Sequence, residues 1–167
     1  MDKNAILNAM EKKAKSLYDK SSDYRTAGKR GVMVVEIKDS KNPDQWESLT
    51  RNFGAVYRFY QYEGELVISN GTNFEALVHG KVAFCKRTEK NSGTNYYQVL
   101  GYESFWPGGM LSDDGNCICA FAGLSGEDDA AIAEAGITCY ESLIRTASKK
   151  EKPETEEEAV TEEVKEV

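Results

Sequence analysis

The stretch from Trp106 to Gly136 reads WPGGMLSDDGNCICAFAGLSGEDDAAIAEAG and predicts, in order, a loop, a hairpin, a buried strand, a glycine turn and a helix. Asp114-Gly115 is a dipeptide that adopts the positive φ angles of a tight hairpin, so Met110-Leu111 should lie antiparallel to the run that begins at Cys117. The residues from Cys117 to Leu124 carry no charged or strongly polar side chain. This run therefore predicts a central strand that is covered on both faces.

A helix is predicted directly after this strand. Ser125 precedes Asp128 by three residues, so the serine can cap the helix while Asp128 reaches back in a capping box. Acidic residues at positions 127–129 also suit the positive end of the helix dipole. The helix should extend to about Ala147, and its spacing predicts an inner face made of Ile132, Ala135, Gly136, Cys139, Leu143 and Ile144.

The first half of the chain predicts a helix followed by strands. Apolar residues at spacings of three and four indicate an amphipathic helix over 4–20. The β-branched run 32–37 predicts the first strand, and 39–53 is interpreted as an insertion with a short helical turn. Two β-prone runs, 55–62 and 65–69, are separated by Glu63-Gly64 and predict a hairpin. Its aromatic residues can pack in a sheet or line a flat ligand.

A second helix is predicted over 73–89, with Lys81 in the middle of its apolar arc. A lysine at this position either snorkels to an edge or has its ammonium matched by a carboxylate, a carbonyl or an anionic ligand, because burying it alone is very costly. Lys81 is therefore a candidate pocket residue, and a snorkelling lysine is the alternative. Small residues on the far side of this helix suggest either an oligomer contact or a thin exposed face; they are Ala76, Gly80 and Ala83.

His79 is the only histidine in the chain and hence the candidate ligand for a haem iron. Its helical position points away from the apolar arc, which argues against that role unless haem lies at a subunit interface. Trp106, Pro107, Gly108 and Gly109 form a loop whose glycines free the backbone to approach a ligand. Together with Lys81, this loop predicts a ligand-binding site.

The C-terminal half resembles the GlcG/HbpS-like family, small domains often described as haem-binding or haem-degrading-like. The shared features are a Pro-Gly-Gly loop, an Asp-Gly hairpin, a small-residue strand, a Ser-Gly turn, acidic residues and an Ala-Gly-bearing helix. The matching residues are Pro107, Gly108, Gly109, Asp114, Gly115, Gly123, Ser125, Gly126, Asp128, Asp129, Ile132, Ala133, Ala135 and Gly136. The context of Lys81 is similar to that of a lysine in the second helix of the family.

This resemblance implies an α/β (α+β) single domain with a mostly antiparallel five-stranded sheet flanked by helices, in a profilin-like layout. It also implies a homo-oligomer and a small-molecule ligand, with haem as the possible cofactor. Family members occur in glycolate, cobalamin and haem contexts, so the resemblance does not fix the ligand.

Composition narrows the possible partners. The formal net charge of the 167-residue chain is −7, which argues against binding nucleic acid. No segment approaches the length of apolar sequence that a membrane span needs, so we expect no membrane partner and a cytoplasmic location. The domain should cover residues 1–147, and the Glu- and Lys-rich stretch 148–167 should be a disordered acidic tail.

Strong signatures of catalysis or metal binding are not found in the sequence. Cys85, Cys117, Cys119 and Cys139 fall in predicted helices and a predicted buried strand, which is typical of reduced cysteines. Cys117 and Cys119 share a strand face, but their spacing differs from that of zinc knuckles, and we expect no metal. A small-molecule binder is the first hypothesis, a non-catalytic structural or interaction module that assembles with itself and binds a protein partner is the second, and an enzyme is the third.

Overall fold

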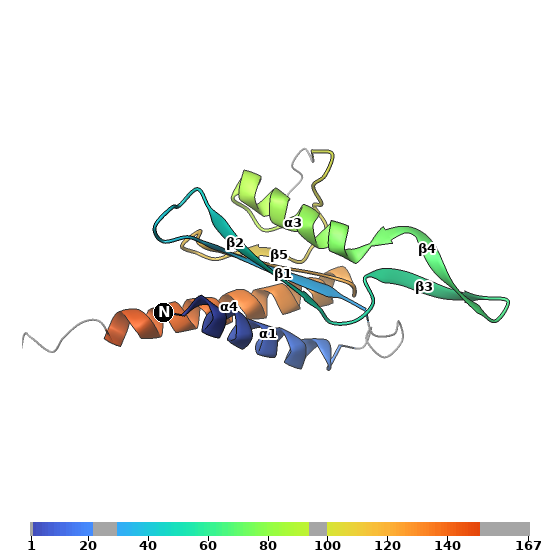
Figure 1. Cartoon of the computed structure of the whole chain (residues 1–167), viewed down its shortest axis with the longest axis horizontal. Coiled ribbons are helices and arrows are strands. Elements are labelled where there is room, and N and C mark those ends of the chain that lie inside the picture. The colour runs from blue at the N-terminus through green and yellow to red at the C-terminus, as the bar shows by residue number, and fades with distance from the viewer. Residues whose placement is uncertain (1, 22–29, 94–99, 151–167) are drawn as a thin grey trace, which may run out of the picture.

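The computed structural model describes residues 2–21, 30–93 and 100–150. Within them the helices are α1 (Lys3–Tyr18), α3 (Phe74–Thr88) and α4 (Gly126–Lys150), and the strands are β1 (Val32–Lys38), β2 (Trp46–Asn52), β3 (Tyr57–Tyr62), β4 (Glu65–Asn73), β5 (Gly109–Leu111) and β6 (Cys117–Ala122). Figure 1 shows three layers: α3 covers one face of an antiparallel sheet, and α1 and α4 lie side by side on the other. The mixed α/β class is confirmed.

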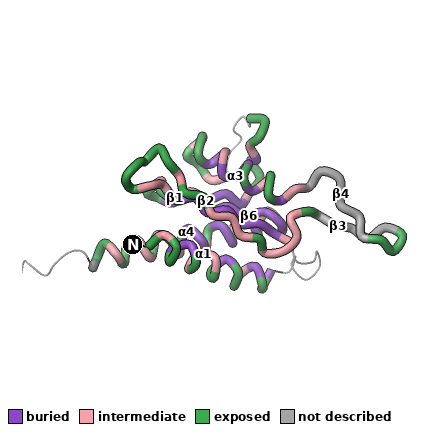
Figure 2. Tube along the Cα trace, viewed as in Figure 1, coloured by how far each residue is buried: buried purple, intermediate pink, exposed green. Residues whose placement is uncertain are grey.

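The stretch that begins at Trp106 supplies β5 and β6, and β6 is one of the two central strands of the sheet. Strand order is β2-β1-β6-β5, and β6 pairs with β1 on one side and with β5 on the other. The predicted hairpin is confirmed, because Met110 pairs with Cys119 and Leu111 with Ile118 across a turn in which Gly115 has a φ of +68°. Every residue of β6 is buried, as the apolar run predicted. Figure 2 shows this burial in the middle of the sheet and on the inner faces of the helices.

The interpretation of residues 39–53 missed a strand, because Trp46–Asn52 is β2 and only residues 42–45 form a short turn, in which Gln45 N–H donates to the Asn42 carbonyl. After a turn in which Asp39 N–H donates to the carbonyl of Gln45, the chain returns as β2, which pairs with β1 along its whole length. Its sequence, WESLTRN, is polar and mostly part-exposed because β2 is an edge strand. An edge strand gains its stability from backbone pairing with its neighbour, so its side chains carry a weak strand signal.

The described residues show a four-stranded sheet rather than the expected five strands. The hairpin across Glu63-Gly64 is confirmed, but β3 and β4 pair only with each other and form a separate two-stranded sheet. Both turn residues have positive φ, 50° and 86°, as a tight hairpin requires. The sequence also predicts a β-prone run over 96–102. Residues 96–99 of this run lie outside the described part, and residues 100–102 are not in a strand. The aromatic side chains of 58–62 also lie outside it.

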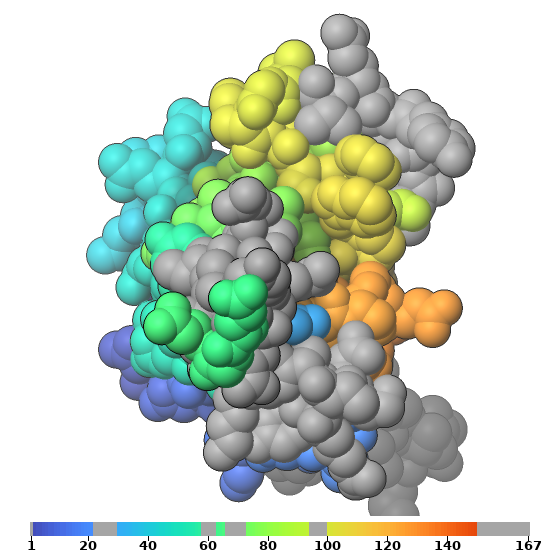
Figure 3. All heavy atoms as spheres, turned by 90° about the vertical axis from the view of Figure 1, so that its right-hand side faces the viewer, coloured from blue at the N-terminus to red at the C-terminus, as the bar shows by residue number. Residues whose placement is uncertain are grey.

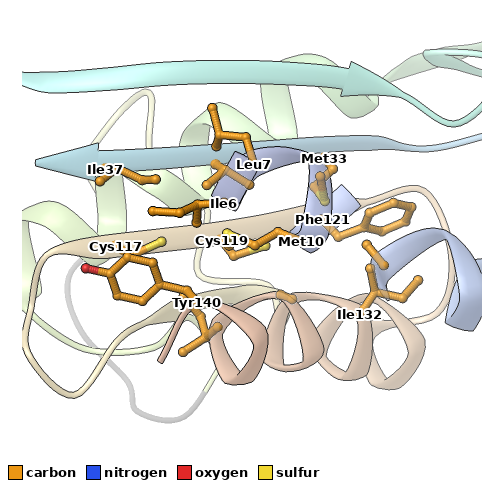
Figure 4. Packing of buried hydrophobic residues seen from close by; sticks show 14 of the residues in the cluster. Ile6, Leu7, Met10, Met33, Ile37, Cys117, Cys119, Phe121, Ile132 and Tyr140 are labelled. Carbon is orange, nitrogen blue, oxygen red and sulfur yellow. The ribbon is translucent and has the colours of Figure 1, made fainter. Parts of the chain in front are cut away.

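Two apolar clusters lie on opposite faces of the sheet because successive side chains of a strand alternate. The larger one joins β1 and β6 to α1 and α4 (Figure 4), and the other joins them to α3. Phe121 is fully buried in the larger cluster, with its ring 5.8 Å from that of Tyr18 and 5.4 Å from that of Phe53. Gly136 lets α4 approach β6, since a Cβ there would lie 2.6 Å from Cys119 Sγ.

Replacing Phe121 with alanine should lower the free energy of unfolding by about 3–5 kcal/mol, because it removes the ring that Tyr18 and Phe53 pack against and leaves a cavity. Chemical denaturation followed by circular dichroism measures this change. Thr138→Ala, on the exposed face of α4, is the control and should change the free energy by no more than about 0.5 kcal/mol. Equal effects of the two substitutions would contradict the assigned core.

Candidate functional site

Lys81 is buried in the middle of α3, and its side chain is 2% exposed. The helix begins where predicted, with the Asn73 side chain accepting a hydrogen bond from Ala76 N–H. Phe74, Leu77 and Lys81 follow the spacing of one helix face, and Phe74 and Lys81 are buried beside the sheet. The snorkelling alternative for Lys81 is therefore wrong.

The ammonium of Lys81 is matched by a carbonyl and a carboxylate, both of which come from the stretch that begins at Trp106. Nζ donates to the carbonyl oxygen of Phe121 at 2.6 Å and to Asp129 Oδ2 at 2.9 Å. Phe121 belongs to β6 and Asp129 to the first turn of α4. One side chain thus connects α3 through the sheet to α4.

Asp129 has a role that the sequence analysis missed. Its second oxygen, Oδ1, accepts a hydrogen bond from Leu124 N–H at 3.0 Å, so the carboxylate also closes the turn between β6 and α4. The sequence pattern indicates Asp129 only as a favourable charge at the helix N-terminus. The sequence holds one signal for the contact between Lys81 and Asp129. A lysine in an apolar arc needs a buried counter-charge, and an acidic residue follows directly after a buried strand.

The predicted serine cap at the start of α4 is confirmed, because Ser125 Oγ accepts from Asp128 N–H at 3.2 Å. Asp128 has a further partner, since its Oδ2 accepts a hydrogen bond of 2.6 Å from Ser21 Oγ. The acidic first turn of α4 therefore holds two distant segments of the chain, with Asp129 facing α3 and Asp128 facing the end of α1.

Gly108 and Gly109 pack directly behind the Lys81–Asp129 pair. Gly108 has a φ of +113°, and a Cβ on it would lie 2.9 Å from Lys81 Nζ and 2.8 Å from Asp129 Cβ. Their backbone groups are used internally: the Gly108 carbonyl accepts from Phe121 N–H, and Gly109 N–H donates to Ser92 Oγ. The amide donor of Gly109 is therefore used inside the chain, and the missing side chain of Gly108 leaves room for the ion pair.

A pocket of about 320 Å³ opens beside the pair. Of the predicted site residues, Lys81, Trp106 and Pro107 line it, and Gly108 and Gly109 do not. The residues that the sequence analysis did not assign to it are Phe74, Leu77, Ala122, Gly123, Leu124, Gly126 and Asp129. The pocket therefore combines apolar walls with one buried ion pair, which is typical of small-molecule sites.

Burial perturbs both members of the ion pair. It raises the pKa of the Asp129 carboxyl to about 6, against the opposing effects of the Lys81 ammonium and of the backbone hydrogen bonds. It also lowers the pKa of Lys81, while the charge and hydrogen bond of Asp129 oppose this shift. Titratable groups with such shifts beside a pocket are candidates for ligand recognition.

His79 lies on the exposed side of α3, away from the residues that line the pocket. The prediction that His79 points away from the apolar arc is confirmed, and in a single copy of the chain His79 is not part of this site.

The small-residue side of α3 is covered in part by the chain itself. A Cβ on Gly80 would lie 2.9 Å from the Tyr102 carbonyl oxygen and 3.0 Å from Ser104 N, so glycine permits close approach of residues 102–104.

The four cysteines are unpaired, and they are divided between the two faces of the sheet. Cys117 and Cys119 share a face, as predicted, whereas Cys85 packs in the cluster on the other face. Burial raises the pKa of the Cys85 and Cys119 thiols to about 12, which makes them poor thiolate ligands. In the described part of the chain, no three His, Cys, Asp or Glu side chains come together as a metal site would require.

Comparison of the sequence with protein-family models finds no match, and comparison with curated proteins finds no similar sequence. Membership of the GlcG/HbpS-like family therefore stays a prediction from the motifs. Among the described residues, none of the helices combines the length and the apolar character that crossing a membrane requires.

The Asp129 pKa gives the pair a pH signature. Between pH 4 and 6 the folded chain holds a proton on Asp129 that the unfolded chain has lost, so this group's contribution to stability falls as pH rises. We expect the free energy of unfolding of the wild type, relative to Lys81→Met/Asp129→Asn, to fall over this range by at most about 1.4 kcal/mol per pH unit.

Chemical denaturation of both proteins at half-unit steps from pH 4 to 7 measures this difference. The double variant is the reference because it removes both charges, and replacing a buried ion pair with neutral residues often leaves stability unchanged or improves it. Parallel stability curves for the two proteins would contradict the raised pKa of Asp129.

Proposed function

We propose that this chain is a small-molecule binding protein of the GlcG/HbpS type, with a profilin-like layout and a homo-oligomeric assembly. Its ligand occupies the pocket between α3, the Trp106-Pro107 segment and the turn between β6 and α4. The ligand class that the pocket favours is a planar molecule with an anionic group. We assign no reaction to the site.

The observation that carries this proposal is the buried Lys81–Asp129 pair in the wall of an otherwise largely apolar pocket. A lysine ammonium has three donors, and within the described residues two of them go to Phe121 and Asp129. Lys81 lines the pocket, so its positive charge lies beside a bound ligand. Phe74, Leu77 and Trp106 supply apolar and aromatic surface for a flat ring.

Haem itself fits this pocket poorly in one copy of the chain. The volume of about 320 Å³ is at the lower end of the range for ligand sites. The only histidine lies on the other side of α3, and none of the lining residues is a histidine, cysteine, methionine or tyrosine that would ligate haem iron. A smaller planar anion is therefore preferred, and haem binding stays a prediction from the family resemblance.

A second candidate function is a non-catalytic assembly module that binds a protein partner. It is favoured by the exposed aromatic side chains of residues 100–106, since contiguous apolar surface marks interaction sites. The two functions are compatible if assembly forms part of the ligand site.

Four unpaired cysteines suit a reducing compartment, and we keep the cytoplasm as the proposed location.

Isothermal titration calorimetry with benzoate and its neutral isostere benzamide tests the ligand class, and haemin titrated with absorbance detection tests the haem prediction. We expect benzoate to bind once per chain and more tightly than benzamide, because only benzoate gains a charged acceptor for Lys81. The Lys81→Met/Asp129→Asn variant should bind benzoate at least tenfold more weakly, a loss of about 1.4 kcal/mol.

The matched control is His79→Ala, which changes an exposed side chain of the same helix and should leave benzoate affinity unchanged. Equal affinity of the wild type and the double variant would remove the ion pair from the site. A saturable Soret band with haemin that is lost in His79→Ala would show instead that haem is bound through the far side of α3.

A further inference from the structure

Lys81 is the one buried lysine among those whose burial is described, and the others are exposed or half-buried. An ammonium that only attracted an anionic ligand would serve at the rim of the pocket, where it stays hydrated. Burial instead favours the uncharged amine, because a charge loses its hydration there. An uncharged amine is a nucleophile, and lysines that form imines with carbonyl compounds are activated by desolvation in apolar pockets.

The position of Lys81 suits a reaction at its side chain. Leu77 and Phe74 lie one and two turns before it on the same helix face and line the pocket with it. Its nitrogen is held in place, because Nζ donates to the Phe121 carbonyl at 2.6 Å and to Asp129 Oδ2 at 2.9 Å. A fixed nucleophile beside a space for a ring reduces the cost of bringing the two reacting groups together.

The pocket walls come from three segments that meet at one end of the molecule. Figure 3 shows this end, where the yellow segment around residues 100–109 lies next to the orange start of α4. The two segments are in contact, because a Cβ on Gly126 would lie 3.3 Å from Pro107 Cγ. Together with α3 they give walls that are mostly apolar. Such walls favour an imine, since they exclude the water that would hydrolyse it.

Asp129 is the only acid, and Lys81 the only base, among the described residues that line the pocket. The two oxygens of Asp129 have different partners. Oδ1 accepts from Leu124 N–H, which fixes the carboxyl, and Oδ2 faces Lys81 Nζ. Burial raises the pKa of this carboxyl to about 6 and lowers the pKa of Lys81. Both shifts favour the uncharged pair, an acid beside an amine.

Transfer of one proton connects the two states of the pair. When a proton moves from Nζ to Oδ2 along their hydrogen bond, the ammonium and the carboxylate become an amine and a carboxylic acid. The net charge of the pair does not change. The ionised state suits an anionic ligand, whereas the uncharged state offers a carbonyl group both a nucleophile and an acid.

We propose that Lys81 binds planar aldehydes or ketones covalently, as an imine, with Asp129 moving the protons. The proposal rests on the proposed function, which places a flat ring against the apolar walls, and it adds the chemical group of the ligand that meets Lys81. The imine is a reversible, covalent form of ligand binding and involves no turnover.

The step is a condensation that needs no oxidant or reductant. The lone pair of Nζ forms a bond to the carbonyl carbon, the carbonyl π electrons move to oxygen, and Asp129 relays a proton from nitrogen to that oxygen. The carboxylic acid of Asp129 then protonates the hydroxyl, which leaves as water while the nitrogen lone pair forms the C=N bond. The remaining N–H proton returns to the Asp129 carboxylate, so the carboxyl ends as it began.

Reductive trapping with benzaldehyde tests the imine. The full chain is incubated with benzaldehyde near pH 7, and sodium cyanoborohydride adds hydride to the imine carbon to leave a stable benzylamine. Peptide mapping by mass spectrometry measures the rate of modification at each lysine. We expect Lys81 to react at least about tenfold faster than the exposed Lys90, because a lowered pKa leaves more of its amine uncharged. Modification of Lys90 without modification of Lys81 would overturn the proposal.

Two variants locate the reactive amine. Lys81→Met/Asp129→Asn lacks the nucleophile, so it should lose the fast modification and keep the slow modification of exposed lysines. Lys90→Met removes an exposed amine just beyond the end of the same helix and should leave the rate at Lys81 unchanged. Circular dichroism verifies that both variants fold. A fast phase that persists in the double variant would place the reactive amine elsewhere and overturn the assignment to Lys81.

Asp129→Asn tests the proton transfer, because it keeps the amine and removes the acid. We expect trapping at Lys81 to slow by about tenfold or more. A purely structural role for Asp129 predicts an equal or higher rate, since a buried amine without a carboxylate partner is uncharged more often. An equal or higher rate in this variant would therefore overturn the role of Asp129.

Competition with benzoate separates this proposal from the ligand proposal. Benzoate has the ring of benzaldehyde with a carboxylate in place of the aldehyde, so it should slow the modification of Lys81 and not that of Lys90. Benzoate that binds by calorimetry while Lys81 stays unmodified by benzaldehyde would overturn the imine and leave the ligand proposal in place. Fast modification of Lys81 that benzoate does not slow would support the imine and contradict the anionic ligand.

Discussion

The buried ion pair between Lys81 and Asp129 is the interaction on which the arrangement of this protein depends. It joins the helix on one face of the sheet to the helix on the other, and it does so through the carbonyl of Phe121 in the central strand. Taking two charges out of water is costly, so such a pair is maintained only with good geometry and with further hydrogen bonds. Both conditions are met here, because Asp129 also accepts from Leu124 N–H and Gly108 has no side chain to displace the ammonium.

The same pair explains why the pocket lies where it does. The chain reaches Lys81 through Trp106 and Pro107, which line the pocket, and it passes close to the lysine at Gly108, which has no side chain. On the opposite wall, the turn closed by Asp129 brings Leu124 and Gly126 to the pocket. A ligand in this position would therefore contact the groups that fix α3 against α4. Ligand affinity and domain stability are expected to be coupled, since a ligand that binds only the folded state stabilises it.

The segment that follows α3 carries four exposed large hydrophobic side chains, which are Leu100, Tyr102, Phe105 and Trp106. Trp106 also lines the pocket. Contiguous apolar surface is typical of interaction sites. The interaction-module and ligand-binding hypotheses therefore both concern surface that includes Trp106.

The sequence by itself determined the local elements with strong periodicity or turn chemistry. The hairpin at Asp114-Gly115, the buried strand 117–122, the cap at Ser125 and the apolar arc of α3 with Lys81 inside it all follow from such patterns, and the structure confirms them. Only the tertiary structure decided the partner of Lys81, the strand nature of 46–52 and the separation of β3 and β4 from the main sheet. The physical reason is common to all three. Local patterns act over a few residues, whereas the Lys81–Asp129 contact, the pairing of an edge strand and the packing of a ribbon depend on segments that folding brings together.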